Sequence, residues 1–147
     1  MINELYKDIT SVTSGIVAHG VNCQKAMGSG VALAIKTKWP LIYEMYMASN
    51  TVLGDTDVIE VDDMLYVANC YTQEYYGNCG GVFASVDAIT SSLRVVYENA
   101  KLYNISVNLP KIGSERGGLD WETEVLPIIT ALDEEFENVT TNLYIWK

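Results

Sequence analysis

Two segments of the chain share one order of elements: an apolar β-type run, a glycine-rich loop, and then a segment with helical spacing. The first runs from GIVAH at residues 15–19 through the loop at 21–30 into a helix-type segment. The second follows the apolar run 105–109 and passes through KIGSERGGLDWE at 111–122. Strands that feed helices through short loops are typical of α/β folds with a largely parallel sheet, which bind ligands beyond the carboxyl ends of the strands.

The same alternation extends along the whole chain. β-type composition predicts six strands, over residues 4–9, 15–19, 57–61, 64–68, 105–109 and 139–146. Helical spacing predicts helices over residues 29–38, 41–48, 85–102 and 120–132. The pair Asp62 and Asp63 predicts a hairpin turn between two of the strands. No repeat or linker interrupts the chain, so we expect residues 1–147 to form one domain, a three-layer α/β/α arrangement around a mixed, largely parallel sheet.

The charge of the chain limits its partners. There are 19 Asp and Glu against 9 Lys and Arg, a formal net charge of -10, which disfavours non-specific nucleic-acid binding and anionic membranes. A small anion held by backbone N–H groups stays compatible with that charge. One His and three scattered Cys indicate neither a metal site nor a disulfide framework, and no cofactor is expected. With no signal-peptide pattern at the N-terminus and reduced thiols, the expected location is cytoplasmic.

The first loop, Val21 to Lys36, has features of an anion site. Gly28 and Gly30 remove side chains where a ligand could approach the backbone, and Ser29 is expected at the N-cap of the following helix. Free N–H groups and the helix dipole would then face an anion. The alternative is an ordinary glycine turn between a strand and a helix.

The second loop offers a similar arrangement. Gly113, Gly117 and Gly118 have a spacing that matches neither a dinucleotide fingerprint nor a P-loop. Two such loops, each after a strand, indicate a ligand with more than one phosphate or with a pyrophosphate.

Four stretches together resemble the macrodomains, a family of ADP-ribose-binding modules. The first loop is similar to the Ala-His-x-x-Asn-x-x-x-x-Met-Gly-x-Gly-[Val/Ile]-Ala run of the subgroup that contains ADP-ribose 1''-phosphate phosphatases and terminal ADP-ribose glycohydrolases. The matching residues are Ala18, His19, Asn22, Met27, Gly28, Gly30, Val31 and Ala32. The second loop, LPKIGSERGGLDWETEV, is similar to that of the same subgroup, and so are KDIT at 7–10 and ANCYTQ at 68–73.

The resemblance implies a binding site and an activity. His19 and Asn22 would be catalytic by positioning the distal ribose, and Asp8 would accept a hydrogen bond from the adenine amine. The implied ligand-binding residues are Asp8, Ile9, Gly28, Ser29, Gly30, Val31, Thr72, Ile112, Gly113, Ser114, Glu115, Arg116, Gly117 and Trp146. The implied activity is hydrolysis at the distal ribose C1'', with ADP-ribose 1''-phosphate as the preferred substrate.

Two departures from the family pattern bear on the activity. Glu115 and Arg116 replace smaller residues in the second loop, and Arg116 has the geometry to hold a phosphate. No Lys occurs from Met64 to Ala100, where the glycohydrolases of the subgroup carry a catalytic Lys. The alternatives are therefore a hydrolase that removes ADP-ribose from protein or nucleic acid, and a non-catalytic ADP-ribose reader or scavenger.

Several of these residues also have purely structural interpretations. His19 could be a satisfied core histidine, and Asp8 a solvated carboxylate at the end of a strand. Asp120 is well placed to cap the helix that follows it. Trp146 or Tyr144 could cover the adenine or simply pack in the core.

Overall fold

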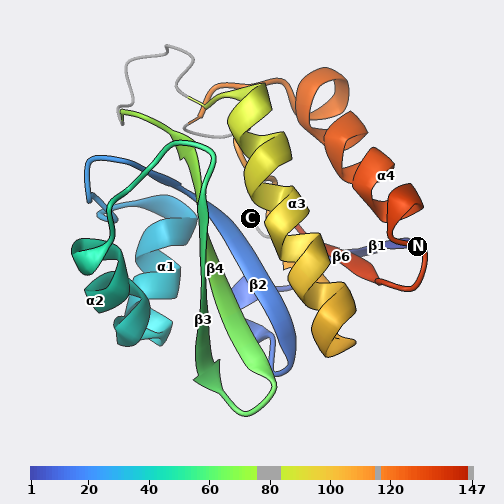
Figure 1. Ribbon diagram of the computed structural model, residues 1–147, viewed down its shortest axis with the longest axis horizontal. Coiled ribbons are helices and arrows are strands. Elements are labelled where there is room, and N and C mark those ends of the chain that lie inside the picture. Colours follow the sequence, from blue (N-terminus) through green and yellow to red (C-terminus); the bar gives the residue numbers. More distant parts are fainter. Residues whose placement is uncertain (76–83, 115–116, 146–147) are drawn as a thin grey trace.

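The computed structural model describes residues 1–75, 84–114 and 117–145, which form a six-stranded sheet between two layers of helices (Figure 1). The strand order is β1-β6-β5-β2-β4-β3. All neighbouring strands are parallel except β3, which pairs antiparallel with β4. The strands are β1 (Ile2–Leu5), β2 (Gly15–Asn22), β3 (Thr56–Asp62), β4 (Leu65–Gln73), β5 (Val107–Leu109) and β6 (Thr141–Tyr144). The mixed, largely parallel sheet predicted from the sequence is confirmed.

The helices cover both faces of this sheet. They are α1 (Gly30–Lys38), α2 (Pro40–Ala48), α3 (Val86–Tyr103) and α4 (Leu126–Glu135), with short turns η1 (Ile9–Ser11) and η2 (Trp121–Val125). Figure 1 shows α1 and α2 on one side of the central strands and α3 and α4 on the other. Each side has its own buried apolar cluster, because successive residues of β2 point to opposite faces: Ile16 joins the α3 and α4 side, and Val17 the α1 and α2 side. The three-layer arrangement is confirmed.

The central strands β2 and β4 extend further toward the loops than their composition predicts. β2 continues to Asn22 and β4 to Gln73, and the register between them shifts between Val21 and Asn22. These extensions carry the two strand ends to the same edge of the sheet, beside the end of β5 at Leu109. No helix in the described part of the chain is long and apolar enough to cross a membrane.

Some predicted boundaries are wrong. The first strand ends at Leu5 rather than at residue 9, because Asp8 caps the turn η1 by accepting a hydrogen bond from the Thr10 N–H at 2.9 Å. The helix predicted from residue 120 begins with the π-helical turn η2, and α4 starts only at Leu126. Pro127 lies in the first turn of α4, where its missing N–H costs no hydrogen bond.

The other ends differ by fewer residues. The strand predicted over 105–109 begins at Val107, and the strand predicted over 139–146 spans Thr141–Tyr144. The hairpin turn between β3 and β4 lies one residue later than predicted, at Asp63 and Met64, and Met64 has a left-handed backbone with φ of 56°.

Candidate functional site

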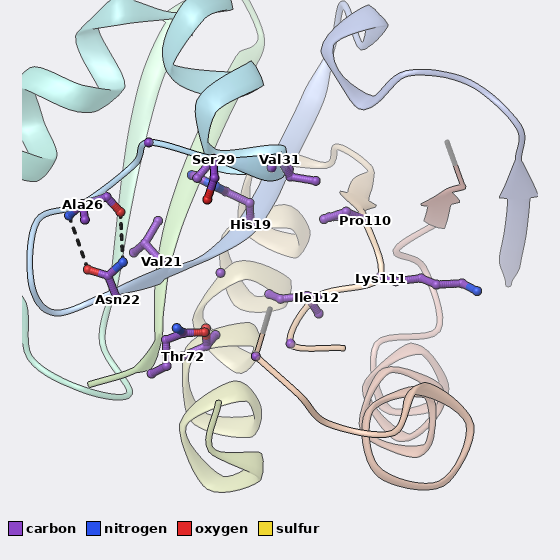
Figure 2. Close-up of a pocket in the computed structure, with 17 residues that line it drawn as sticks. His19, Val21, Asn22, Ala26, Ser29, Val31, Thr72, Pro110, Lys111 and Ile112 are labelled. Carbon is purple, nitrogen blue, oxygen red and sulfur yellow. Dashed lines mark hydrogen bonds between the residues drawn. The ribbon is translucent and has the colours of Figure 1, made fainter. Parts of the chain in front are cut away.

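A cavity of about 460 Å³ opens at the carboxyl ends of β2, β4 and β5 (Figure 2). Its walls are the first glycine-rich loop with the start of α1 on one side, and the second glycine-rich loop on the other. Its size is typical of a small-molecule site. The residues that line it are His19, Gly20, Val21, Asn22, Ala26, Gly28, Ser29, Gly30, Val31, Ala32, Thr72, Gln73, Pro110, Lys111, Ile112, Gly113 and Gly117.

The lining contains no carboxylate among the described residues, although the chain has 19 Asp and Glu. Among these described residues, Lys111 carries the one charged side chain. Figure 2 shows this side chain directed away from the cavity, and its Nζ lies 5.9 Å from the centre of the Trp121 ring. Within the described part of the chain, the cavity wall of this acidic protein thus carries no negative side chain, which favours an anionic ligand.

The start of α1 supplies hydrogen-bond donors to the cavity. Ser29 occupies the N-cap position as predicted, but its side chain makes no capping hydrogen bond. The first N–H groups of a helix have no partner within the helix, so those of α1 are available to a ligand in the cavity. Since the helix dipole also favours negative charge at this end, this wall of the cavity can hold a phosphate.

The glycines of the second loop have a packing role as well. A Cβ at Gly117 would lie 2.5 Å from the Gly113 carbonyl oxygen and 2.7 Å from Ala84 Cβ. Gly113 has φ of +77°, and a Cβ there would lie 2.6 Å from Ile89 Cδ1. The loop therefore needs glycine at both positions to fold against the start of α3. Both residues also line the cavity, as the sequence predicts.

His19 is a buried polar residue at the site, with 1% of its surface accessible. Its Nε2 lies 2.7 Å from Asn69 Oδ1, and since that oxygen can only accept, Nε2 carries the proton. Burial lowers the pKa of the imidazole to about 4, although the bond to Asn69 opposes the shift. His19 is therefore neutral at pH 7 and unsuited to act as a general acid there. The imidazole Nδ1 and the Asn69 Nδ2 are buried and have no hydrogen-bond partner among the described residues, so this buried pair is only partly satisfied.

The Asn22 side chain is engaged in the loop itself. Its Nδ2 donates to the Ala26 carbonyl at 2.9 Å, and its Oδ1 accepts from the Gln24 N–H at 2.9 Å and from the Ala26 N–H at 3.4 Å (Figure 2). The Tyr46 hydroxyl donates to the same Oδ1 at 2.8 Å. Asn22 lines the cavity, but its side-chain polar atoms form hydrogen bonds within the loop and stabilise its shape.

Asp8 and Ile9 do not line the cavity. Asp8 Oδ1 accepts from both the N–H and the hydroxyl of Thr10, whereas Oδ2 has no hydrogen bond within the described part of the chain. Ile9 is buried, and Tyr144 packs against the same apolar cluster. One carboxylate oxygen of Asp8 thus remains free to accept a further hydrogen bond.

The other predicted site residues fall into three groups. Gly28, Ser29, Gly30, Val31, Thr72, Ile112, Gly113 and Gly117 all line the cavity. Ser114 does not, and its hydroxyl donates to the Lys111 carbonyl at 2.7 Å. Glu115, Arg116 and Trp146 lie outside the described residues.

The sequence interpretation missed seven lining residues, namely Gly20, Val21, Ala26, Ala32, Gln73, Pro110 and Lys111. Most are neighbours of predicted residues on strand ends. No sequence pattern marks Gly20 as a site residue, yet a Cβ there would lie 2.6 Å from Thr72 Oγ1. The missing side chain at Gly20 leaves room for the Thr72 side chain, which also lines the cavity.

The fold and the two-loop cavity define the class of protein. Over 98% of its length the chain superposes on the macrodomain of Mycobacterium tuberculosis DarG, with a TM-score of 0.84, 23% identity and 97% of that chain covered. It also superposes on Thermosipho africanus DarTG in complex with ADP-ribose, with a TM-score of 0.81 and 19% identity, over 98% of this chain and 41% of that one. The chain has the macrodomain fold, as its motifs predicted.

Sequence similarity agrees with the fold. The chain is 26% identical over 135 residues to a DNA ADP-ribosyl glycohydrolase of Mycobacterium tuberculosis, a match that includes 86% of this chain. The match spans only 37% of the length of that relative. The chain is 28% identical over 142 residues to an ADP-ribose 1''-phosphate phosphatase of the yeast Meyerozyma guilliermondii, over 76% of this chain and 81% of that protein. No family model matches the chain.

Proposed function

We propose that the cavity binds ADP-ribose and that the chain hydrolyses ADP-ribose 1''-phosphate at the distal ribose, which yields ADP-ribose and inorganic phosphate. The observation that supports the binding part is the pair of glycine-rich loops around the cavity, with the uncapped N-terminus of α1 on one wall and no carboxylate among the described lining residues. This arrangement suits a pyrophosphate, because backbone N–H groups bind phosphate oxygens without needing a basic surface.

The chemistry of the lining favours a phosphate as the group released. Among the described lining residues no carboxylic acid is present, and the buried His19 is neutral at pH 7. The described lining residues therefore include no carboxylic acid or charged imidazole that could donate a proton to a poor leaving group. A departing phosphate needs stabilisation of negative charge instead, which fixed N–H donors provide. Catalysis would rest on orientation of the substrate and on electrostatic stabilisation.

A second candidate is the removal of ADP-ribose from a macromolecule. The 26% identity to a DNA ADP-ribosyl glycohydrolase favours it. The absence of Lys from Met64 to Ala100 argues against a lysine-dependent mechanism of the kind that the subgroup uses. A chain that binds ADP-ribose without turnover would be a reader or a scavenger.

Single-turnover assays separate these functions. The wild-type chain, in excess, is incubated with ADP-ribose 1''-phosphate, with an ADP-ribosylated oligonucleotide and with an ADP-ribosylated protein. We expect release of inorganic phosphate from the first substrate, and release in the Gly28→Val variant should fall to the uncatalysed rate. Release of ADP-ribose from either macromolecule alone would overturn the phosphatase assignment, and binding without any release would make the chain a reader.

A further inference from the structure

The bend of the first loop is held by a buried tyrosine that lies outside the loop. Tyr46, in α2, has no exposed surface, and its hydroxyl lies 2.6 Å from the Asn22 carbonyl oxygen and 2.8 Å from Asn22 Oδ1. Both atoms are acceptors, so the hydroxyl donates to Asn22. Burial raises the pKa of Tyr46 to about 12, although the backbone groups of Ala26 and Lys25 oppose the rise. The donor proton is therefore present at neutral pH.

The Asn22 side chain in turn forms hydrogen bonds within the loop. Its side-chain amide pairs with both backbone polar groups of Ala26, which closes the bend over residues 22–26. A second tie to α2 comes from Lys25, whose Nζ donates to the Met47 carbonyl at 2.7 Å. Lys25 has a left-handed backbone with φ of 60°, which a β-carbon-bearing residue adopts only when its surroundings hold it there.

The anchored segment forms part of the cavity wall. Asn22 and Ala26 line the cavity, and Gly28 to Val31 follow directly and supply the N–H groups at the start of α1. The position of the bend thus decides where these donors lie relative to a ligand. A loop that samples other shapes would bind less tightly, because only the fraction in the competent shape contributes to affinity.

We propose that Tyr46 is a positioning residue: through Asn22 it holds the first loop in the shape that binds the distal half of the ligand. This inference rests on the proposed ADP-ribose binding. Tyr46 itself does not line the cavity, whereas its hydrogen-bond partner Asn22 does. The effect of Tyr46 should therefore depend on which part of the ligand contacts the loop.

The test uses Tyr46→Phe, with Tyr97→Phe as its matched control. Tyr97 is equally buried, and its hydroxyl lies 2.6 Å from Thr141 Oγ1 on the far side of the sheet. Both substitutions remove one buried hydroxyl and one hydrogen bond, so both should lower stability to a similar extent. Calorimetric titrations with ADP-ribose and with AMP, which lacks the distal ribose and one phosphate, are carried out on the wild type and both variants.

We expect Tyr46→Phe to weaken ADP-ribose binding by roughly three- to tenfold, the effect of one lost hydrogen bond, while AMP binding changes by less than about twofold. Tyr97→Phe should change neither. Without ligand, amide hydrogen exchange at Gln24 and Ala26 should become faster in Tyr46→Phe and stay unchanged in Tyr97→Phe.

The outcomes that overturn the inference are distinct from those that overturn the proposed function. Unchanged ADP-ribose affinity in Tyr46→Phe, or an equal loss in Tyr97→Phe, would mean that the hydroxyl only stabilises the fold. A wild type that does not bind ADP-ribose would refute the proposed function instead. In that case the exchange rates at Gln24 and Ala26 still decide whether Tyr46 orders the loop, and unchanged rates would refute the inference.

Discussion

Gly28 and Gly30 both line the cavity, but their backbones differ. A Cβ built on Gly28 meets no atom of the described residues within 4 Å, so its position is open toward the ligand space. Gly30 has φ of 61°, a left-handed conformation that side chains with a β-carbon rarely adopt. The sequence presents these two glycines as equivalent members of one Gly-x-Gly, and only the backbone angles distinguish them.

Gly28→Val should abolish ADP-ribose binding and leave the melting temperature unchanged, because the added side chain occupies ligand space without touching the protein. Gly30→Val should lower stability as well, by about 1–2 kcal/mol, because a left-handed β-branched residue is strained. Thermal melts and calorimetric titrations of both variants provide the comparison. Full binding by Gly28→Val would remove the first loop from the site.

Asp8 offers a second test at the level of single atoms. Only its Oδ1 is used to cap η1, by accepting from the Thr10 N–H and hydroxyl. In Asp8→Asn the cap can remain, while an NH₂ group replaces the free oxygen expected to accept from the adenine amine. We expect binding of both AMP and ADP-ribose to weaken by about 1–3 kcal/mol, with an unchanged melting temperature. If calorimetry shows equal affinities for variant and wild type, Asp8 caps η1 but does not bind the ligand.

At the scale of elements, α1 is a helix whose N-terminus lacks a side-chain cap. By contrast Asp120 caps η2, where its Oδ1 accepts from the Thr123 N–H at 2.9 Å, and Ser85 caps α3 through the Ala88 N–H. α2 and α4 also begin without a side-chain cap, but each has a proline in its first turn. The uncapped start of α1 has no such proline and lies beside the cavity, where a ligand can complete the cap.

Ser29→Asp tests whether the uncapped N-terminus of α1 binds an anion. A carboxylate at the N-cap should hydrogen-bond the first turn of α1 and raise the melting temperature slightly. The same carboxylate should repel the phosphates of the ligand, so we expect ADP-ribose binding to weaken by at least about tenfold. Ser29→Asn, which can cap without charge, is the control. Wild-type affinity in Ser29→Asp would mean that no phosphate lies there.

The elements themselves could largely be predicted from the sequence, whereas their boundaries could not. Alternating apolar runs identify every strand, and helical spacing identifies the four α-helices. The boundaries failed where local side-chain bonds compete with the regular pattern, as Asp8 does at η1. They also failed at the central strands, where β2 and β4 extend because each pairs with the other. Pairing over long sequence distances leaves no signal in a local window.

At the scale of the whole molecule, the cavity is lined by more segments of the chain than the two glycine-rich loops. The two loops could be located from glycine spacing alone, and they supply most of the cavity wall. Further contributions include Gln73 at the end of β4 and Pro110 directly after β5, which only the parallel sheet brings together. The tie between Tyr46 and Asn22 joins residues 24 positions apart and could not be read from either motif.

The buried His19 should make stability depend on pH. Its pKa in the folded chain is about 4 against an ordinary value of 6.5, so the unfolded chain takes up a proton over this range and the folded chain does not. Stability should therefore fall as the pH falls from 6.5 to 4, and this group accounts for about 3 kcal/mol of that loss.

Urea titrations of the wild type and His19→Gln from pH 7 to pH 4 measure this contribution. The glutamine amide can still donate to Asn69 but does not titrate, so the variant should lose less stability over the range, while the carboxylates contribute alike in both. If the free energy of unfolding changes with pH in the same way in both proteins, the pKa of His19 is not lowered by burial.

The central claim is that the cavity between the two loops binds ADP-ribose along its whole length. Calorimetric titration of the wild-type chain with ADP-ribose, and separately with AMP, tests it most directly. We predict a single site with a dissociation constant on the order of micromolar, near −8 kcal/mol, and clearly weaker binding of AMP. An AMP affinity equal to that of ADP-ribose, or no binding of ADP-ribose at all, would contradict the claim.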